Sequence, residues 1–594
     1  MQLSTLDWSI VAAFFVLSLV IGLVVSKRAG QSASEYFLSG RSMPWWLLGF
    51  SMVATTFSAD TPNLVTDIVR KNGVSGNWQW WAFLLTGMLT VFVYAKLWRR
   101  SGVLTDLEFY ELRYSGKEAA FLRGFRALYL GVFFNIMIMA TVSLAAIKIG
   151  GVLLGLSPMQ TILIASLVTV AYTSLGGLTG VIWTDFFQFI VAMIGVVWAA
   201  YVVVNLPQVG GLDAMLAHPN VVGKLNVLPD FNDMSVLVPF LIMPIAIQWW
   251  SVWYPGAEPG GGGYIAQRML SAKNENHAIT ATLFFNIVHY ALRPWPWIAV
   301  ALASLIVFPD LASLKTAFPN LADNIINDDL AYPAMMTFLP SGLLGIIVAA
   351  LIAAYMSTIA THLNWGSSYV VNDFYQRFIK PEASDKELVN VGRISTVVLM
   401  VFSALLALML SNALQAFNIL LQIGAGTGLI FILRWFWWRI NAWSEISAMV
   451  ISFLVALWFA FVQTDVASHL QLIYGVGITT VGWLVVTFMT QPTAHSKLLS
   501  FYKLIKPQPN GWQAVIQPAI KAGELKESDV IPGKLPLEIM CMIAGCFLVY
   551  GALFGLGFWM YGETTKALIG LGVTIVASLI LMKSWSQVKG SMEE

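Results

Sequence analysis

The sequence predicts an all-α integral membrane protein with many membrane-spanning helices. Of its 594 residues, 58% are hydrophobic and 11% are charged, whereas a soluble protein carries about 25% Asp, Glu, Lys and Arg. The mean hydropathy is +0.74, and the 24 Trp, 36 Phe and 18 Tyr supply rings that suit the membrane interfaces. These values exclude a soluble globular protein.

About 15 segments are long and apolar enough to cross a bilayer, which takes about 20 mainly apolar residues in a helix. They lie at 8–26, 44–69, 78–97, 123–150, 158–176, 181–205, 236–255, 278–308, 336–363, 391–411, 413–435, 443–463, 467–490, 536–559 and 564–583. In the first segment the basic residues Lys27 and Arg28 follow the apolar stretch, and no small-residue cleavage site is evident. We therefore expect it to remain as a helix and not to be removed as a signal peptide.

The distribution of Lys and Arg predicts the orientation, because these residues stay preferentially in cytoplasmic loops. If the N-terminus is outside, the inside loops hold 25 of the 33 basic residues and the outside loops hold 6. We therefore expect the N-terminus outside and the C-terminus in the cytoplasm. The net charge of +2 gives no electrostatic reason to expect a nucleic-acid partner.

The loops are too short to form a separate catalytic domain. The longest, 491–535, begins with an amphipathic stretch around Phe501 and Tyr502, for which we expect a helix lying on the membrane surface. The two cysteines, Cys541 and Cys546, are too few for a disulfide framework and are not spaced as a metal site. We expect them to be reduced residues that contribute to packing.

Two of the predicted spans are interrupted. The second contains the polar stretch Thr55–Thr61 followed by Pro62, and proline removes a backbone hydrogen bond from a helix. The seventh runs into Pro255–Gly263, which contains two prolines and five glycines. Carbonyls freed in this way need a partner inside a membrane, and an ion or a substrate would provide one. The alternatives are simple proline kinks, or a cytoplasmic loop at Gly260–Gly263.

The two interruptions are five spans apart. Because five crossings reverse the direction of the chain, spans two to six and seven to eleven would form an inverted pair. Interruptions at matching positions of two such repeats indicate a transporter site near the middle of the bilayer.

Hydroxyl and carboxyl groups occur in other spans. Ser357, Thr358 and Thr361 lie on span nine, where their oxygens could bind sodium opposite the freed carbonyls of span two; alternatively they bond to their own backbone or to a neighbouring helix. Asp185 lies near the inner end of span six. An ionisable residue in a span suggests a function, although a structural hydrogen bond would also explain it.

Several polar residues are candidates for binding a solute. Asp60 and Glu258 lie at the interruptions, where helix N-termini support a carboxylate that binds a cation, relays a proton or meets a polar solute. His289 and Arg293 share a helix face and could hold a carboxylate or sugar hydroxyls, unless Arg293 neutralises a buried acid or reaches the outer interface. Gln79 lies among tryptophans that form either a stacking surface or an interfacial belt. The candidates are Thr56, Asp60, Gln79, Trp81, Glu258, His289, Arg293 and Gln422.

Four motifs resemble the sodium:solute symporter family, which includes bacterial sodium/galactose, sodium/proline and sodium/sialic acid transporters. The similarity covers roughly residues 8–490, and the motifs are at 54–60, 175–185, 264–273 and 354–358. It implies a LeuT-type five-plus-five inverted repeat that works by alternating access. The repeats would span 44–205 and 206–437, after an additional helix and loop at 1–43. Two peripheral helices at 438–490, the cytoplasmic loop 491–535 and two C-terminal helices with the tail at 536–594 would follow.

The resemblance also implies a sodium site. The family's ligands map onto the carbonyls of Ala54, Phe57 and Ala354 and the hydroxyls of Ser357 and Thr358. Asp185 matches the family aspartate near the sodium exit path. Some members bind a second sodium ion through a further pair of serines, where this chain has Ala360 and Thr361. Since Ala360 lacks a hydroxyl, we expect one sodium ion per cycle.

The substrate does not carry over from the resemblance. In the family's sugar transporters an acidic residue stands where this chain has Gln79, and a lysine lies near the position of His289. Pro255–Gly263 replaces the asparagine and the gating tyrosine of the seventh span.

We therefore expect a sodium-coupled secondary active symporter that imports a small polar organic solute, a sugar or a sugar-like compound. The alternatives are a sodium- or proton-coupled symporter of amino acids or carboxylates, and a membrane solute sensor with a transporter fold. Na⁺ would be the coupling ion, and we expect neither an organic cofactor nor enzymatic activity. We expect a monomer or weak homo-oligomer, surrounded by lipid, that spans the inner (cytoplasmic) membrane several times.

Overall fold

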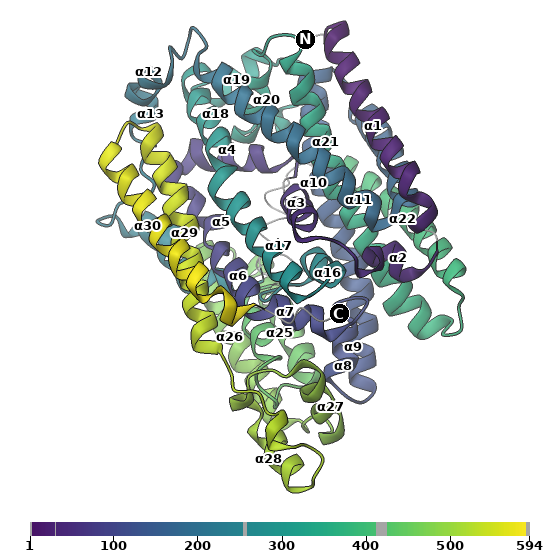
Figure 1. The fold of residues 1–594 in the computed structure, drawn as a ribbon. Helices are drawn as coiled ribbons and strands as arrows, with labels where there is room; N and C mark the ends of the chain where they lie inside the picture. Colours follow the sequence, from purple (N-terminus) through teal and green to yellow (C-terminus); the bar gives the residue numbers. More distant parts are fainter. Residues whose placement is uncertain (1–2, 30, 57, 253–257, 411–423, 590–594) are drawn as a thin grey trace.

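The computed structural model describes residues 3–29, 31–56, 58–252, 258–410 and 424–589. Within these ranges the regular structure is helical, apart from an isolated β-bridge between Met43 and Ala272. The helices form one bundle (Figure 1). The N-terminus lies at one end of this bundle, and α27 (His495–Ile505) and α28 (Gln513–Lys521) lie at the other.

Eleven helical stretches in the described part of the chain are long and apolar enough to cross a membrane. They are Thr5–Val25, Val74–Ser101, Lys117–Leu154, Gly176–Val204, Glu275–Val307, Leu343–Ile379, Asp385–Met409, Ala442–Phe461, Ser468–Met489, Leu535–Met560 and Thr564–Val588. Pro158–Ala171 and Met234–Trp250 are shorter apolar helices. Residues 413–423 of predicted span 413–435 lie outside the described residues, so the count of 15 stays a prediction.

Several crossings consist of more than one helix. Apart from α27, α28 and the helices around the two interruptions and Gly177, which are described below, the helices are α1 (Thr5–Ala29), α2 (Ala33–Leu38), α5 (Trp78–Trp81), α6 (Phe83–Leu89), α7 (Ala95–Ser101), α8 (Glu108–Arg113), α9 (Lys117–Leu128), α10 (Asn135–Ile149), α12 (Leu212–Ala217), α13 (Pro219–Val222), α17 (Glu275–Ile287), α18 (Pro294–Val307), α19 (Leu311–Ala317), α20 (Ala331–Met336), α21 (Leu343–Ser368), α22 (Asp385–Met409), α24 (Gly428–Leu433), α25 (Ala442–Phe461), α26 (Ser468–Met489), α29 (Leu535–Met560) and α30 (Thr564–Val588). π-helical turns join some of them, at Thr90–Tyr94, Tyr129–Phe134, Gly150–Leu154, Val238–Ile242, Val288–Leu292 and Tyr369–Ile379. Such turns are frequent at functional sites.

The second span is interrupted where the sequence predicts it. Helix α3 (Trp45–Thr56) ends within the polar stretch, and α4 (Thr61–Asn72) begins at its last residue. Pro62 lies in the first turn of α4. There its missing N–H removes no helical hydrogen bond, so proline begins the second helix.

The seventh span is interrupted as well. It consists of α14 (Met234–Leu237), α15 (Met243–Ala246) and, after the glycine-rich stretch, α16 (Gly263–Ser271). Gly260 and Gly261 have φ angles of +85° and +90°, and a Cβ on Gly260 would lie 2.9 Å from the ring of Tyr94. Gly260–Gly263 is buried. The stretch is therefore packed inside the protein.

Predicted spans five and six are two helices that meet at a kink at Gly177. Helix α11 (Pro158–Val204) is helical on both sides of Gly177, whose φ of +53° breaks the regular geometry. L-residues with a side chain rarely adopt this conformation, which explains the glycine at this point in the motif 175–185.

The amphipathic stretch in 491–535 lies against the bundle. Phe501 and Trp512 are fully buried, the indole N–H of Trp512 donates to the carbonyl of Trp435 at 3.1 Å, and the guanidinium of Arg113 lies 4.8 Å from the Trp512 ring. Protein covers the apolar face of α27, which corrects the prediction of a helix lying on the membrane surface.

Candidate functional site

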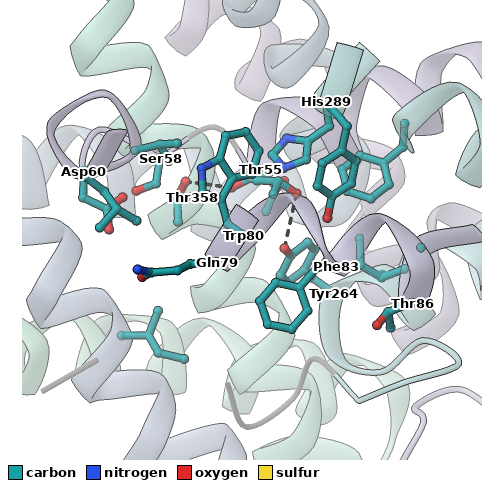
Figure 2. Close-up of a pocket in the computed structure, with 18 of the residues that line it drawn as sticks. Thr55, Ser58, Asp60, Gln79, Trp80, Phe83, Thr86, Tyr264, His289 and Thr358 are labelled. Atoms are coloured by element: carbon teal, nitrogen blue, oxygen red, sulfur yellow. Dashed lines mark hydrogen bonds between the residues drawn. The ribbon is translucent and has the colours of Figure 1, made fainter. Parts of the chain in front are cut away.

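A cavity of about 430 Å³ lies beside both interruptions. Its walls come from the end of α3 and the start of α4, from the stretch between Gln79 and Thr90, from α16 and from the stretch between Thr282 and Tyr290. Figure 2 shows polar and aromatic side chains from these elements around one space, among them Ser58, Asp60, Gln79, Trp80 and His289.

Aromatic rings form one wall of the cavity. The Trp80 ring stacks on Tyr290, with 5.9 Å between the ring centroids and 25° between the planes. It also lies 5.7 Å from the ring of His289. The hydroxyls of Thr56 on α3 and Tyr264 on α16 are 3.3 Å apart.

Of the predicted substrate residues, Thr56, Asp60, Gln79, Glu258 and His289 line this cavity. Among the described residues that line it, the tryptophan is Trp80 and not Trp81. The Trp81 side chain is fully buried, and its ring lies 5.7 Å from the ring of Phe554 on α29. Gln422 lies outside the described residues.

Arg293 is fully buried and does not belong to the cavity lining. Its Nη1 donates to the carbonyl of Val53 at 2.8 Å and lies 3.0 Å from Nδ1 of His289. The guanidinium therefore supplies a donor to a carbonyl near the end of α3, where the interruption begins. It also holds the imidazole that faces the cavity.

Glu258 forms a buried ion pair with Arg126 of α9. This pair ties the start of the glycine-rich stretch to a neighbouring helix. Asp106, in the connection before α8, accepts from the backbone N–H of Gly263 at 2.9 Å and from the hydroxyl of Tyr369. Burial raises the pKa of Asp106 to about 6, and the negative charge of Glu258 contributes to this rise.

Four of the five predicted sodium ligands lie on α3 and α21, which are packed together. The hydroxyl of Thr358 donates to the carbonyl of Thr55 at 2.9 Å, next to Ala54. The hydroxyl of Ser357 donates to Asp185 at 2.6 Å. Carbonyl, hydroxyl and carboxylate oxygens are the hard ligands that suit sodium. Phe57 lies outside the described residues.

Asp185 joins two of the sequence motifs. Its second oxygen accepts from the hydroxyl of Ser51 at 2.5 Å, and the guanidinium of Arg268 lies 3.8 Å away. Arg268 also donates to the hydroxyl of Thr361 at 2.7 Å. A fixed positive charge therefore contacts Thr361, the residue considered for a second cation. Arg268 lies within the motif 264–273, but its residue type and position along the chain do not indicate this contact with Asp185 and Thr361.

Comparisons with known proteins show which proteins the chain is similar to. The model of the sodium:solute symporter family matches residues 36–452. The sodium/glucose cotransporter of Vibrio parahaemolyticus is 28% identical over 502 residues, which cover 81% of this chain and 89% of that protein. The sodium/mannose cotransporter SLC5A10 of Bos taurus is 28% identical over 470 residues, covering 74% and 76%.

A solved structure supports the fold. A Na⁺-coupled sialic acid symporter, in a substrate-bound outward-open state, superposes with a TM-score of 0.68 at 22% identity. The match covers 83% of this chain and 99% of that one.

Proposed function

Because the chain belongs to the sodium:solute symporter family, we propose that it couples inward movement of sodium to the uptake of a small polar organic solute, a sugar or a sugar-like compound. The observation that carries this proposal is the cavity beside both interruptions, which hydroxyl, amide and aromatic side chains line. Hydroxyl-rich solutes bind through such hydrogen-bonding groups and stack on aromatic faces.

The charges around the cavity favour a neutral solute over a carboxylate. Among the described residues that line the cavity, Lys71 is the only lysine, and there is no arginine. The Lys71 ammonium lies 2.7 Å from the carboxylate of Asp67. Arg126 is paired with Glu258. A carboxylate in the cavity would meet Asp60 and Glu258 and would lack an available cationic partner, which costs free energy in a low-dielectric site.

Sodium would bind where α3 and α21 meet, at the carbonyls of Ala54, Phe57 and Ala354 and the hydroxyls of Ser357 and Thr358. Thr358 also lines the solute cavity, so the two sites would be neighbours. Bound sodium would then favour the state that binds solute, because a ligand shifts a conformational equilibrium by its differential affinity for the two states.

In this proposal the chain works by alternating access on a LeuT-type five-plus-five inverted repeat, with 44–205 and 206–437 as the repeats. The N-terminus would lie outside, the C-terminus in the cytoplasm, and the protein in the inner membrane. The two matched interruptions support this scheme, since such breaks in repeated halves surround the binding site of many transporters.

The test is the thermal stability of the purified, detergent-solubilised protein in sodium chloride and in potassium chloride at equal ionic strength. Sugars, amino acids and small carboxylates are added separately, because a ligand that binds only the folded protein raises its melting temperature. We expect a neutral sugar or polyol to stabilise the protein only with sodium. If sodium changes nothing with any solute, the proposal is wrong, and proton coupling or a sensor role takes its place.

A further inference from the structure

Helix α29, the first helix of the C-terminal hairpin, packs on the walls of the cavity, although it lies outside the residues 36–452 that match the family model. It contacts α6 and the two π-helical turns Thr90–Tyr94 and Val288–Leu292. In Figure 1 the hairpin of α29 and α30, drawn in yellow and yellow-green, stands beside α5 and α6. Its second helix, α30, is mostly exposed, whereas α29 buries residues such as Val549 and Leu553 completely.

On the first wall, α29 holds the short helix α5. The hydroxyl of Tyr550 donates to the carbonyl of Trp81 at 2.8 Å, and the Tyr550 ring lies 5.2 Å from the ring of Trp78. The last carbonyls of a helix have no partner within it, and a four-residue helix is too short to be stable on its own. Tyr550 therefore supplies both a donor and packing to the turn that carries Gln79 and Trp80.

On the second wall, α29 holds the start of α18. The indole N–H of Trp295 donates to the carbonyl of Leu553 at 2.7 Å. Gly557 allows the Trp295 ring this close, because a Cβ on Gly557 would overlap the ring. Trp295 lies three residues after the π-helical turn Val288–Leu292, which carries His289 and Tyr290.

We propose that α29 is a positioning element for the solute site. Through Tyr550 and Leu553 it holds α5 and the turn before α18 so that Trp80 stacks on Tyr290 at the cavity wall. The described residues of the proposed sodium site lie on other helices, α3 and α21, and of these Thr358 also lines the cavity. Loss of these contacts should therefore weaken solute binding and leave sodium binding unchanged. The inference rests on the proposed function, because it concerns the same solute site.

The test uses Tyr550→Phe in the purified full-length chain, with the solute that stabilises the wild type in sodium. Removing one hydrogen bond between neutral groups should weaken solute affinity by about 2- to 10-fold, while the sodium concentration for half-maximal stabilisation stays the same. Tyr474→Phe is the matched control, because Tyr474 is 49% exposed on α26. It should change neither value.

Trp295→Phe is the second variant, since it removes the indole N–H donor to Leu553 and keeps an aromatic ring. We expect the same separation of solute affinity from sodium affinity. Wild-type solute affinity in both folded variants would overturn the inference, and so would an equal loss of affinity for solute and sodium. If no solute stabilises even the wild type, the proposed function fails and the inference fails with it.

Discussion

The guanidinium of Arg268 lies 3.8 Å from the carboxylate of Asp185, and neither side chain is exposed. Arg268 belongs to α16, which follows the second interruption, and Asp185 belongs to α11. The same carboxylate accepts from Ser51 on α3 and from Ser357 on α21. One ion pair thus joins four helices around the candidate sodium site.

Breaking this ion pair should destabilise the protein strongly. Arg268→Met leaves the Asp185 carboxylate buried without its charged partner, which costs about 3–5 kcal/mol. We expect a much lower melting temperature and partial recovery in the double variant Arg268→Met/Asp185→Asn. Arg377→Met is the control, because Arg377 pairs with Glu111 while 44% exposed, and an exposed pair contributes about 0–1 kcal/mol. Equal losses in the two single variants would contradict the role given to Arg268.

The hydroxyls of Ser357 and Thr358 should set the sodium requirement. In the proposed sodium site, replacing either by alanine would remove an oxygen ligand from the cation, and an interaction with a charged group contributes about 1.5–3 kcal/mol. We expect the sodium concentration for half-maximal solute binding to rise at least about tenfold. Ser452→Ala, a buried change on α25, should leave it unchanged. Unaltered sodium dependence in both alanine variants would remove the sodium site from α21.

Neighbouring tryptophans on α5 should respond differently to the same substitution. Trp80→Leu removes the ring that lines the cavity, and an aromatic contact contributes about 0.5–1.5 kcal/mol. Solute affinity should therefore fall by roughly 2- to 12-fold at little cost in melting temperature. Trp81→Leu removes a fully buried ring that packs on Phe554, so it should lower the melting temperature. Binding curves and melting curves of both variants separate the two effects, and the reverse pattern would restore Trp81 to the site.

Asp106 should make stability fall as the pH rises through about 6. Burial raises its pKa to about 6 in the folded protein, from an ordinary value near 3.9. A raised carboxyl pKa favours the folded state while the group holds its proton, and this contribution is lost on ionisation. The melting temperature of the wild type relative to Asp106→Asn should therefore decline between about pH 4 and pH 6 and level off above it, by the equivalent of about 3 kcal/mol in total. Parallel pH profiles of the two proteins would show that Asp106 does not titrate in this way.

The helical class, most of the spans and both interruptions follow from local sequence. A run of about 20 apolar residues has few alternatives to a membrane helix, and Pro62 and the glycines at 260–263 mark where the second helices of the two interrupted spans begin. The hydroxyls of span nine can also be predicted from the sequence, because they depend only on the residue types in that span. The count of 15 spans and the orientation remain predictions.

Contacts between distant segments could not be predicted in the same way. The sequence by itself determined which residues are polar within the spans, because hydropathy and helix breaking depend on neighbours along the chain. Only the tertiary structure decided that Arg268 meets Asp185, that Trp80 and not Trp81 lines the cavity, and that α29 supports its walls. Arg268 and Asp185 are 83 positions apart, and Trp81 and Tyr550 of α29 are 469 positions apart. Trp80 and Trp81 are neighbours, so a rotation of α5 by one residue would exchange their places. Helix packing decides both, and it depends on side-chain shapes across the whole bundle.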